Sequence, residues 1–208
     1  GSADYRKSNG VDLRSSREEY GGRASAEFKS KGGMFNFTAN IAPRIIYQNF
    51  ANWSVFTNAK QANPTTPLMD PENSQLYYNF QGQVCPWNPV ELQKLEKDEG
   101  ETKLIDMDAT AKLNLLPLLW KADKDCPFTL DTQLTFADHQ TGNNKSWFRP
   151  STSTIAINSG REGEASREYN NTSQYILEWL ANFGARFRRN NIKLMLGYSY
   201  QYTKYSTL

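Results

Sequence analysis

Residues 173–187 are SQYILEWLANFGARF, and residues 192–204, IKLMLGYSYQYTK, follow them after the four residues RRNN. Every second position of both stretches is mostly apolar, so that Leu177 and Trp179 are separated by Glu178. Side chains alternate between the two faces of a β-strand, and this period of two therefore predicts two strands with one apolar face each. The short polar connection predicts that they form an antiparallel hairpin.

The same alternation occurs in four earlier segments, at about 20–30, 34–48, 104–115 and 128–140. Each is as long as the roughly 9–11 residues that cross a bilayer as a tilted strand, or longer, whereas strands of globular proteins peak near 5–6 residues. We therefore expect an all-β fold, an antiparallel up-and-down meander of about six long strands. The meander is predicted to be part of a transmembrane β-barrel with two long outer loops.

The connections between these segments alternate in length. Long outer loops are predicted at about 49–103 and 141–172, and short periplasmic turns at 31–33 and 188–191. This alternation is typical of outer-membrane barrels.

Prolines and short polar stretches give further expectations. Pro117 argues against a helix in the intermediate linker 116–127, and Pro43 predicts a bulge or a locally unpaired edge. Residues 91–97 are predicted to form a short helical turn.

Composition excludes several functional classes. The 208 residues contain 24 basic and 22 acidic side chains, a net charge of +2. The basic ones are scattered, so we expect no nucleic-acid partner. The single histidine, His139, and the two cysteines give no metal motif, and no cofactor is expected. The predicted topology separates Cys85 from Cys126, which predicts no disulfide between them.

Two remaining expectations concern organisation and catalysis. Residues 1–2, Gly-Ser, are interpreted as the remainder of an expression tag, and residues 3–208 as a segment of one barrel domain. Asp106 and Asp108 lie on the polar face of their strand, where carboxylates of a barrel lumen need no acid–base role. Asp131 and Lys112 are interpreted as lumen charges that pair across neighbouring strands. We expect that the chain is not an enzyme.

The first long loop is rich in aromatic residues, and these are the candidate site residues. Such rings can pack the loop internally, contact a protein partner or stack on a substrate. The residue pattern leaves these three interpretations open for Phe50, Trp53, Phe56, Tyr77, Tyr78, Phe80 and Trp87.

Six short motifs, taken in order, give the chain a resemblance to a known family. They are SREEYGGR (16–23), NPTTPL (63–68), WNPV (87–90), PSTST (150–154), LEW (177–179) and GYSYQ (197–201). Together they resemble the SusC-like TonB-dependent outer-membrane transporters of Bacteroidetes, over nearly the whole chain.

The resemblance implies a barrel of about twenty-two strands, of which this chain is an interior portion without the plug domain. It implies import of glycans, or of peptides, through the cell outer membrane. The implied partners are a SusD-like surface lipoprotein that acts as a lid, TonB through parts outside this chain, and outer-membrane lipid.

Two alternatives stay open. A soluble all-β carbohydrate-binding module would bury the apolar faces in a core, whereas a barrel would expose them to lipid. A different TonB-dependent transporter, for example one for a metal chelate, would lack the loop motifs.

Overall fold

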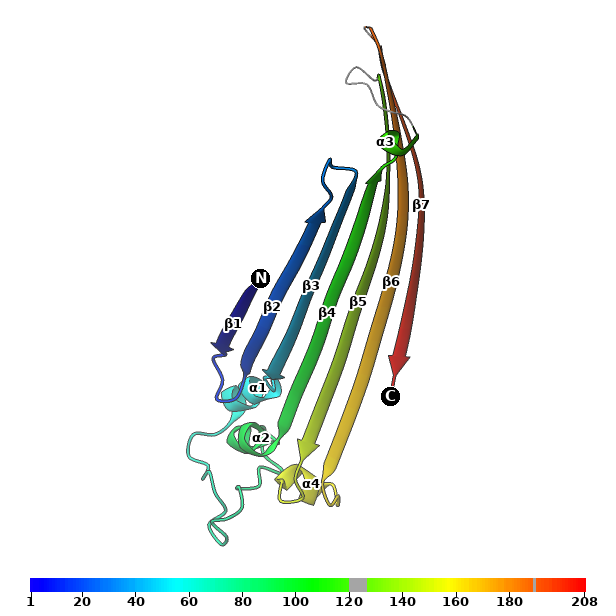
Figure 1. Ribbon diagram of the computed structural model, residues 1–208. Helices are drawn as coiled ribbons and strands as arrows, with labels where there is room; N and C mark the ends of the chain where they lie inside the picture. Colours follow the sequence, from blue (N-terminus) through cyan, green and yellow to red (C-terminus); the bar gives the residue numbers. More distant parts are fainter. Residues whose placement is uncertain (120–126, 189) are drawn as a thin grey trace.

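The computed structural model describes residues 1–119, 127–188 and 190–208, and its main body is one antiparallel β-sheet (Figure 1). The strands lie in the order of the chain, so the sheet is an up-and-down meander. The strands are β1 (Ser2–Asn9), β2 (Ser16–Lys29), β3 (Phe35–Asn49), β4 (Lys97–Asn114), β5 (Phe128–Arg149), β6 (Glu164–Phe187) and β7 (Asn190–Thr207).

The sheet is open, with β1 and β7 as its edges, and it has seven strands where the sequence predicted about six. The additional strand is β1, whose residues SADYRKSN contain one large apolar side chain, Tyr5. All eight of its residues are exposed, so neither face required an apolar pattern. The backbone of β1 pairs with β2 from Ser2↔Arg23 to Asn9↔Ser16.

The register places the predicted apolar faces of the strands on one side of the sheet. One row runs from Ala109 through Phe136 and Leu177 to Tyr200 on four neighbouring strands. Many of these side chains are exposed, Leu177 to 39% and Leu196 to 61%. We call this side the apolar face and the opposite side the polar face.

Hydrogen bonds between neighbouring strands connect side chains on the polar face. The His139 Nδ1 lies 2.8 Å from the Asp106 Oδ1, and the Asn40 Nδ2 donates to the Asp108 Oδ2 at 2.8 Å. The hydroxyl oxygens of Thr110 and Thr135 are 3.2 Å apart.

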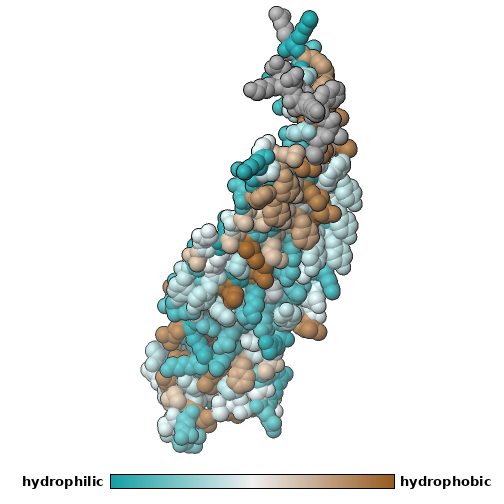
Figure 2. All heavy atoms as spheres, in the orientation of Figure 1, coloured by the Kyte–Doolittle hydropathy of each residue, from teal (hydrophilic) through white to brown (hydrophobic). Residues whose placement is uncertain are grey.

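The strands continue past the apolar segments, and the long loops are therefore shorter than expected. The loops comprise residues 50–96 and 150–163, instead of about 49–103 and 141–172. The added segment Lys97–Lys103 of β4 is polar on both faces. It therefore lacks the alternation of apolar and polar residues, although its backbone pairs with β5. Figure 2 shows hydrophobic residues gathered over the upper half of the sheet and hydrophilic residues over the lower half and the loops.

Three connections, 10–15, 50–96 and 150–163, lie at one end of the sheet, which we call the loop end. The helices α1 (Ser54–Gln61), α2 (Pro89–Leu95) and α4 (Thr154–Asn158) lie there (Figure 1). Helix α2 includes most of the helical turn predicted at 91–97.

The linker between β4 and β5 contains a single helical turn, α3 (Leu116–Leu119), which corrects the expectation of no helix. Pro117 lies in its first turn, where the missing amide hydrogen has no helical partner to lose. Residues 120–126, with Cys126, lie outside the described residues, and Cys85 is a free thiol.

Pro43 produces no bulge. The pairing of β2 with β3 keeps one register on both sides of it, from Gly21↔Arg44 to Ala24↔Ile41, and only the two intervening pairs are left out. The expected local loss of pairing is thus present, while on the other side Pro43 pairs with Ile105 of β4. Proline has no amide hydrogen and cannot donate a hydrogen bond to the neighbouring strand. The pairing can skip this position without an extra residue being inserted into the strand.

The connection between β6 and β7 is shorter than the predicted turn, because Asn190 and Asn191 already belong to β7. Arg188 has a positive φ of 48 degrees. This left-handed conformation reverses the chain direction here. Among the residues that the structure describes, no helix combines the length and the apolar character needed to cross a membrane.

Candidate functional site at the loop end

The two long loops pack against each other at the loop end. Val55 of α1, Leu92 of α2 and Ile155 of α4 form a small buried cluster, and Trp87 packs against it. We call the assembly of α1, α2 and α4 around these residues the loop cluster. It holds together segments that are far apart in the sequence, and it gives the loops a fixed shape.

Asn88 organises the first long loop. Its exposed fraction is 1%, and its Oδ1 accepts hydrogen bonds from the backbone amides of Val90 at 3.2 Å and Glu91 at 3.4 Å, which caps α2. Its Nδ2 donates to the carbonyls of Leu68 and Tyr78. Asn88 is followed by Pro89 in the first helical turn. An asparagine cap followed by a proline is a pattern expected at the start of a helix.

Glu91 connects the two long loops. Its buried carboxylate accepts hydrogen bonds from the Thr154 backbone amide and from the Thr154 hydroxyl, each at 2.5 Å. Nearby, the buried thiol of Cys85 donates to the Trp87 carbonyl at 3.1 Å and lies 3.5 Å from the Asn58 Oδ1. Buried polar groups of this kind stabilise the native arrangement only when each has a partner.

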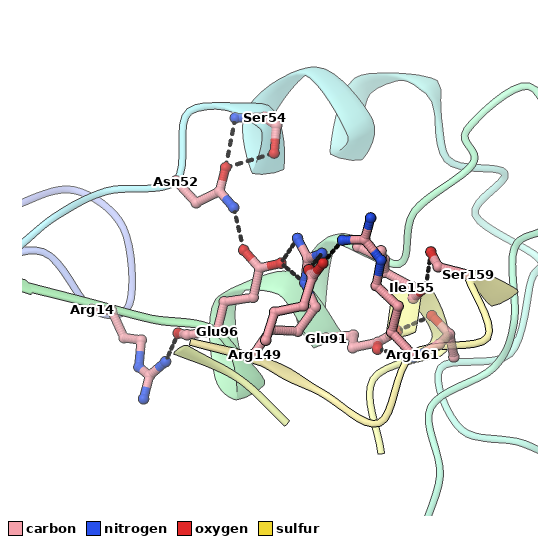
Figure 3. A network of polar contacts seen from close by, with 11 residues as sticks. Arg14, Asn52, Ser54, Glu91, Glu96, Arg149, Ile155, Ser159 and Arg161 are labelled. Atoms are coloured by element: carbon pink, nitrogen blue, oxygen red, sulfur yellow. Dashed lines mark hydrogen bonds and ion pairs between the residues drawn. The ribbon is translucent and has the colours of Figure 1, made fainter. Parts of the chain in front are cut away.

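An ion-pair network ties the loop cluster to the strands (Figure 3). The Arg149 guanidinium lies 2.5 Å from the Glu96 Oε1 and 2.8 Å from the Glu164 Oε2, and Arg161 also pairs with Glu164. Asn52 donates to the other Glu96 oxygen at 2.9 Å. The side chain of Glu96 is 7% exposed and that of Arg149 is 17% exposed. Solvent therefore screens these pairs less than it screens surface pairs.

Most of the predicted site aromatics pack inside the first long loop. Phe80 is buried, and its ring centroid lies 6.0 Å from that of Tyr78. Phe56, Tyr77 and Trp87 are half-buried. For these residues the structure favours internal packing among the three interpretations.

Trp53 and Phe50 differ from the others. Trp53 precedes α1 and is 75% exposed, and the tilted Phe56 ring has its centroid 5.9 Å from that of Trp53. Phe50 lies over Gly100 on the polar face, so close that a Cβ on Gly100 would meet the ring at 2.7 Å. The Lys145 Nζ lies 5.0 Å from the centre of the same ring.

A hollow of about 330 Å³ opens beside Phe50, between the loop cluster and the polar face. Trp147 and Asp98, which pair across β5 and β4, contribute to its lining together with Asn52 and Trp53. One oxygen of Asp98 is buried without a hydrogen-bond partner, and the other lies 3.5 Å from Lys145. Aromatic rings beside a carboxylate and an amide suit a ligand with apolar faces and several hydroxyl groups.

Sequence reasoning missed Trp147 and Asp98 because it placed both in loops. The signal for them was weak, since both lie in strand extensions where apolar and polar residues do not alternate. A larger hollow, of about 990 Å³, lies at the other end of the sheet beside Asp131, Asn182 and Arg186. It is formed by β5 to β7, and among the described residues its lining includes one aromatic side chain, Phe183. The hollow beside Phe50 gathers three aromatic side chains, Phe50, Trp53 and Trp147, and we therefore favour it.

The predicted lumen carboxylates Asp106, Asp108 and Asp131 have hydrogen-bond partners in the sheet. Asp106 and Asp108 contact different neighbours, His139 and Asn40, and do not act on each other. Asp131 accepts a hydrogen bond from Asn182 at 2.8 Å, whereas Lys112 has no ion pair in the described part of the chain. Among the described residues no group of three or more metal-ligating side chains occurs.

Comparison with known proteins adds no relative. No protein-family model matches this sequence, and no curated protein matches it either.

Proposed function

We propose that this chain is part of the barrel wall of a SusC-like TonB-dependent importer in the cell outer membrane, which takes up glycans or other large nutrients. The chain supplies strands and outer loops, and import itself requires parts outside it. The observation that most supports this proposal is the apolar face. It is continuous in register over six neighbouring strands, and its large side chains are exposed.

An exposed apolar surface of this extent is costly in water. The strands of a membrane barrel avoid that cost, because their apolar side chains contact lipid hydrocarbon while the polar side chains between them face the lumen. In this arrangement the hydrogen-bonded polar face lines the lumen, and the loop end faces the outside of the cell. The long loops at one end are consistent with outer loops.

The hollow beside Phe50 suits substrate contact in this proposal, because it lies on the polar face at the mouth of the lumen. Trp53 is the loop aromatic best placed for a partner such as a SusD-like lid lipoprotein, since it is exposed at the surface of the loop cluster. Large exposed aromatic residues often anchor protein interfaces.

The alternative, a soluble carbohydrate-binding module, requires a second layer over the apolar face. In the part of the chain that the structure describes, all strands belong to one sheet and the helices lie at its ends. The apolar face therefore has no internal cover among these residues.

Behaviour in solution distinguishes a segment of a barrel wall from a soluble module. The full chain is prepared in buffer without detergent, and in parallel is refolded from denaturant with phosphatidylcholine vesicles. We expect aggregation in buffer, through the apolar face and the two open edges, and co-flotation with the vesicles. A detergent-free monomer that unfolds cooperatively and stays apart from vesicles would contradict the proposal.

A further inference from the structure

A cleft of about 470 Å³ opens on the apolar face, toward the loop end of the sheet. Three neighbouring strands each contribute three successive outward-facing residues to it. They are Glu101, Lys103 and Ile105 of β4, Gln140, Gly142 and Asn144 of β5, and Arg167, Tyr169 and Asn171 of β6. The cleft is separate from the hollow beside Phe50, which lies on the other face.

Gly142 provides the space at the centre of the cleft. It pairs with Lys103 on one side and with Asn171 on the other, so the middle strand carries no side chain between them. A Cβ at this position would meet only the Tyr169 hydroxyl, at an ordinary contact distance of 3.7 Å. Glycine is not required here by packing, and its presence within a strand fits the close approach of a ligand.

The lining has the chemistry of a site for a phosphorylated sugar. Lys103 and Arg167 are two cations against one carboxylate, Glu101, which lies 2.7 Å from the Lys103 Nζ. The Arg167 Nε donates to the Asn144 Oδ1 at 3.0 Å, which orients the guanidinium. Guanidinium and ammonium groups bind phosphate, and the amides and the Tyr169 hydroxyl can bind sugar hydroxyls.

The cleft lies at the border between the apolar segments and the polar strand extensions. The next row toward the other end of the sheet contains Met107, the buried Asp138 and Tyr175, and Phe136 and Leu177 follow in the row after it. Tyrosines mark the same border on the first strands, where the Tyr5 and Tyr20 rings lie 5.0 Å apart. Tyrosine side chains concentrate at the depth of lipid headgroups.

We propose that this cleft binds the phosphorylated saccharide headgroup of a membrane glycolipid. The inference rests on the proposed function, because it needs the apolar face to be in contact with lipid. The cleft then holds one headgroup against the barrel wall, with its phosphate near Lys103 and Arg167 and its sugar ring over Gly142.

Vesicle flotation of the refolded full chain tests this proposal. Three vesicle types are compared: phosphatidylcholine alone, phosphatidylcholine with a bis-phosphorylated glucosamine disaccharide lipid, and phosphatidylcholine with phosphatidylglycerol at matched surface charge. We expect the glycolipid to raise binding above both other types. The Lys103→Gln/Arg167→Gln variant should lose up to roughly 30-fold of the glycolipid binding.

Two further variants test whether glycolipid binding depends on the cleft itself or only on the positive charge of the chain. Gly142→Val fills the cleft without changing charge, and we expect it to lose the glycolipid preference while it keeps binding to phosphatidylcholine. Lys112→Gln/Arg186→Gln removes the same charges from the polar face of the same strands β4 and β6, and it should keep the preference.

The outcomes separate this inference from the proposed function. If the chain binds no vesicle, the proposed function and this inference both fail. If it binds all three types equally, or binds phosphatidylglycerol as well as glycolipid, only this inference fails. Unchanged preference in both the Gly142→Val and Lys103→Gln/Arg167→Gln variants would also overturn it.

Discussion

Thr154 donates two hydrogen bonds to the carboxylate of Glu91, one from its backbone amide and one from its hydroxyl. The two residues belong to different loops, and both are buried. The contact lies beside the apolar cluster of Val55, Leu92 and Ile155. The two long loops are therefore coupled by a buried carboxylate to which, among the described residues, Thr154 donates both hydrogen bonds.

Replacement of Thr154 by valine should loosen the loop cluster. Valine has nearly the same shape but leaves one oxygen of the buried Glu91 carboxylate without its hydroxyl donor, which costs roughly 1–3 kcal/mol. Hydrogen exchange should become faster in α2 and α4 and stay unchanged in β4 to β6. Thr57→Val, at an exposed position of α1, is the matched control. Equal exchange in the two variants would contradict the coupling.

Asn88→Ala should release the segment before α2. The change removes the helix cap, and loss of such a cap costs roughly 1 kcal/mol. It also removes the two bonds that hold the carbonyls of Leu68 and Tyr78. Limited proteolysis should then cut between residues 68 and 88 much sooner than in the wild-type chain. Asn73→Ala is the control, because among the described residues the Asn73 side chain accepts a bond from Gln75 alone, within its own exposed turn. Slow cleavage of Asn88→Ala would show that Asn88 is dispensable.

The turn between β1 and β2 should depend on pH through Asp12. Burial raises the pKa of Asp12, but hydrogen bonds from the Ser15 hydroxyl and amide, from Gln93 and from the Arg14 backbone outweigh it, so the pKa lies below its usual value. A lowered pKa stabilises the fold above the unfolded-state pKa, near about 4, and this contribution is lost as pH falls through the folded-state pKa.

Amide exchange in residues 10–15, corrected for its intrinsic pH dependence, measures this effect. Protection should decline as pH falls below about 4 in the wild-type chain. Asp12→Asn keeps an acceptor for Ser15 but does not titrate in this range, and its protection should not change with pH. A parallel decline in both chains would assign the effect to other carboxylates.

The sequence predicted the parts of the fold in which one strand face is apolar and the other polar. In residues 173–187 the apolar positions from Tyr175 to Phe187 were assigned to one face and Gln174, Glu178, Asn182 and Arg186 to the other, and the register agrees with this assignment. Strand β1 and the extension Lys97–Lys103 were missed, because neither has a face of alternating apolar residues, although the backbone of each pairs with its neighbour. Backbone pairing leaves no periodic signal in the residue types.

The loop end was predictable in composition but not in geometry. Its aromatic residues were singled out from the sequence, but the contact between Glu91 and Thr154 joins residues 63 positions apart, and no local rule pairs them. One usable signal was overlooked. Asn88 followed by Pro89 is a helix-start pattern, and it locates the beginning of α2.

The orientation of the sheet can be tested at two adjacent positions of β6. Leu177 lies on the apolar face and is exposed, whereas Ile176 lies on the polar face, where it pairs with Ala137 and Gln201. An arginine on a lipid-facing strand position costs roughly 2–4 kcal/mol near the bilayer midplane, while a lumen position tolerates charge.

Leu177→Arg should therefore reduce insertion of the refolded chain into phosphatidylcholine vesicles by at least about tenfold, and Ile176→Arg should change it little. Protection of the strands from added protease, with and without vesicles, measures insertion for both variants. In a soluble module the apolar face would instead be a core, and Leu177→Arg would then destabilise the chain equally in the absence of vesicles. A larger loss for Ile176→Arg than for Leu177→Arg would reverse the assignment of the two faces, and the polar face could then no longer be the lumen wall.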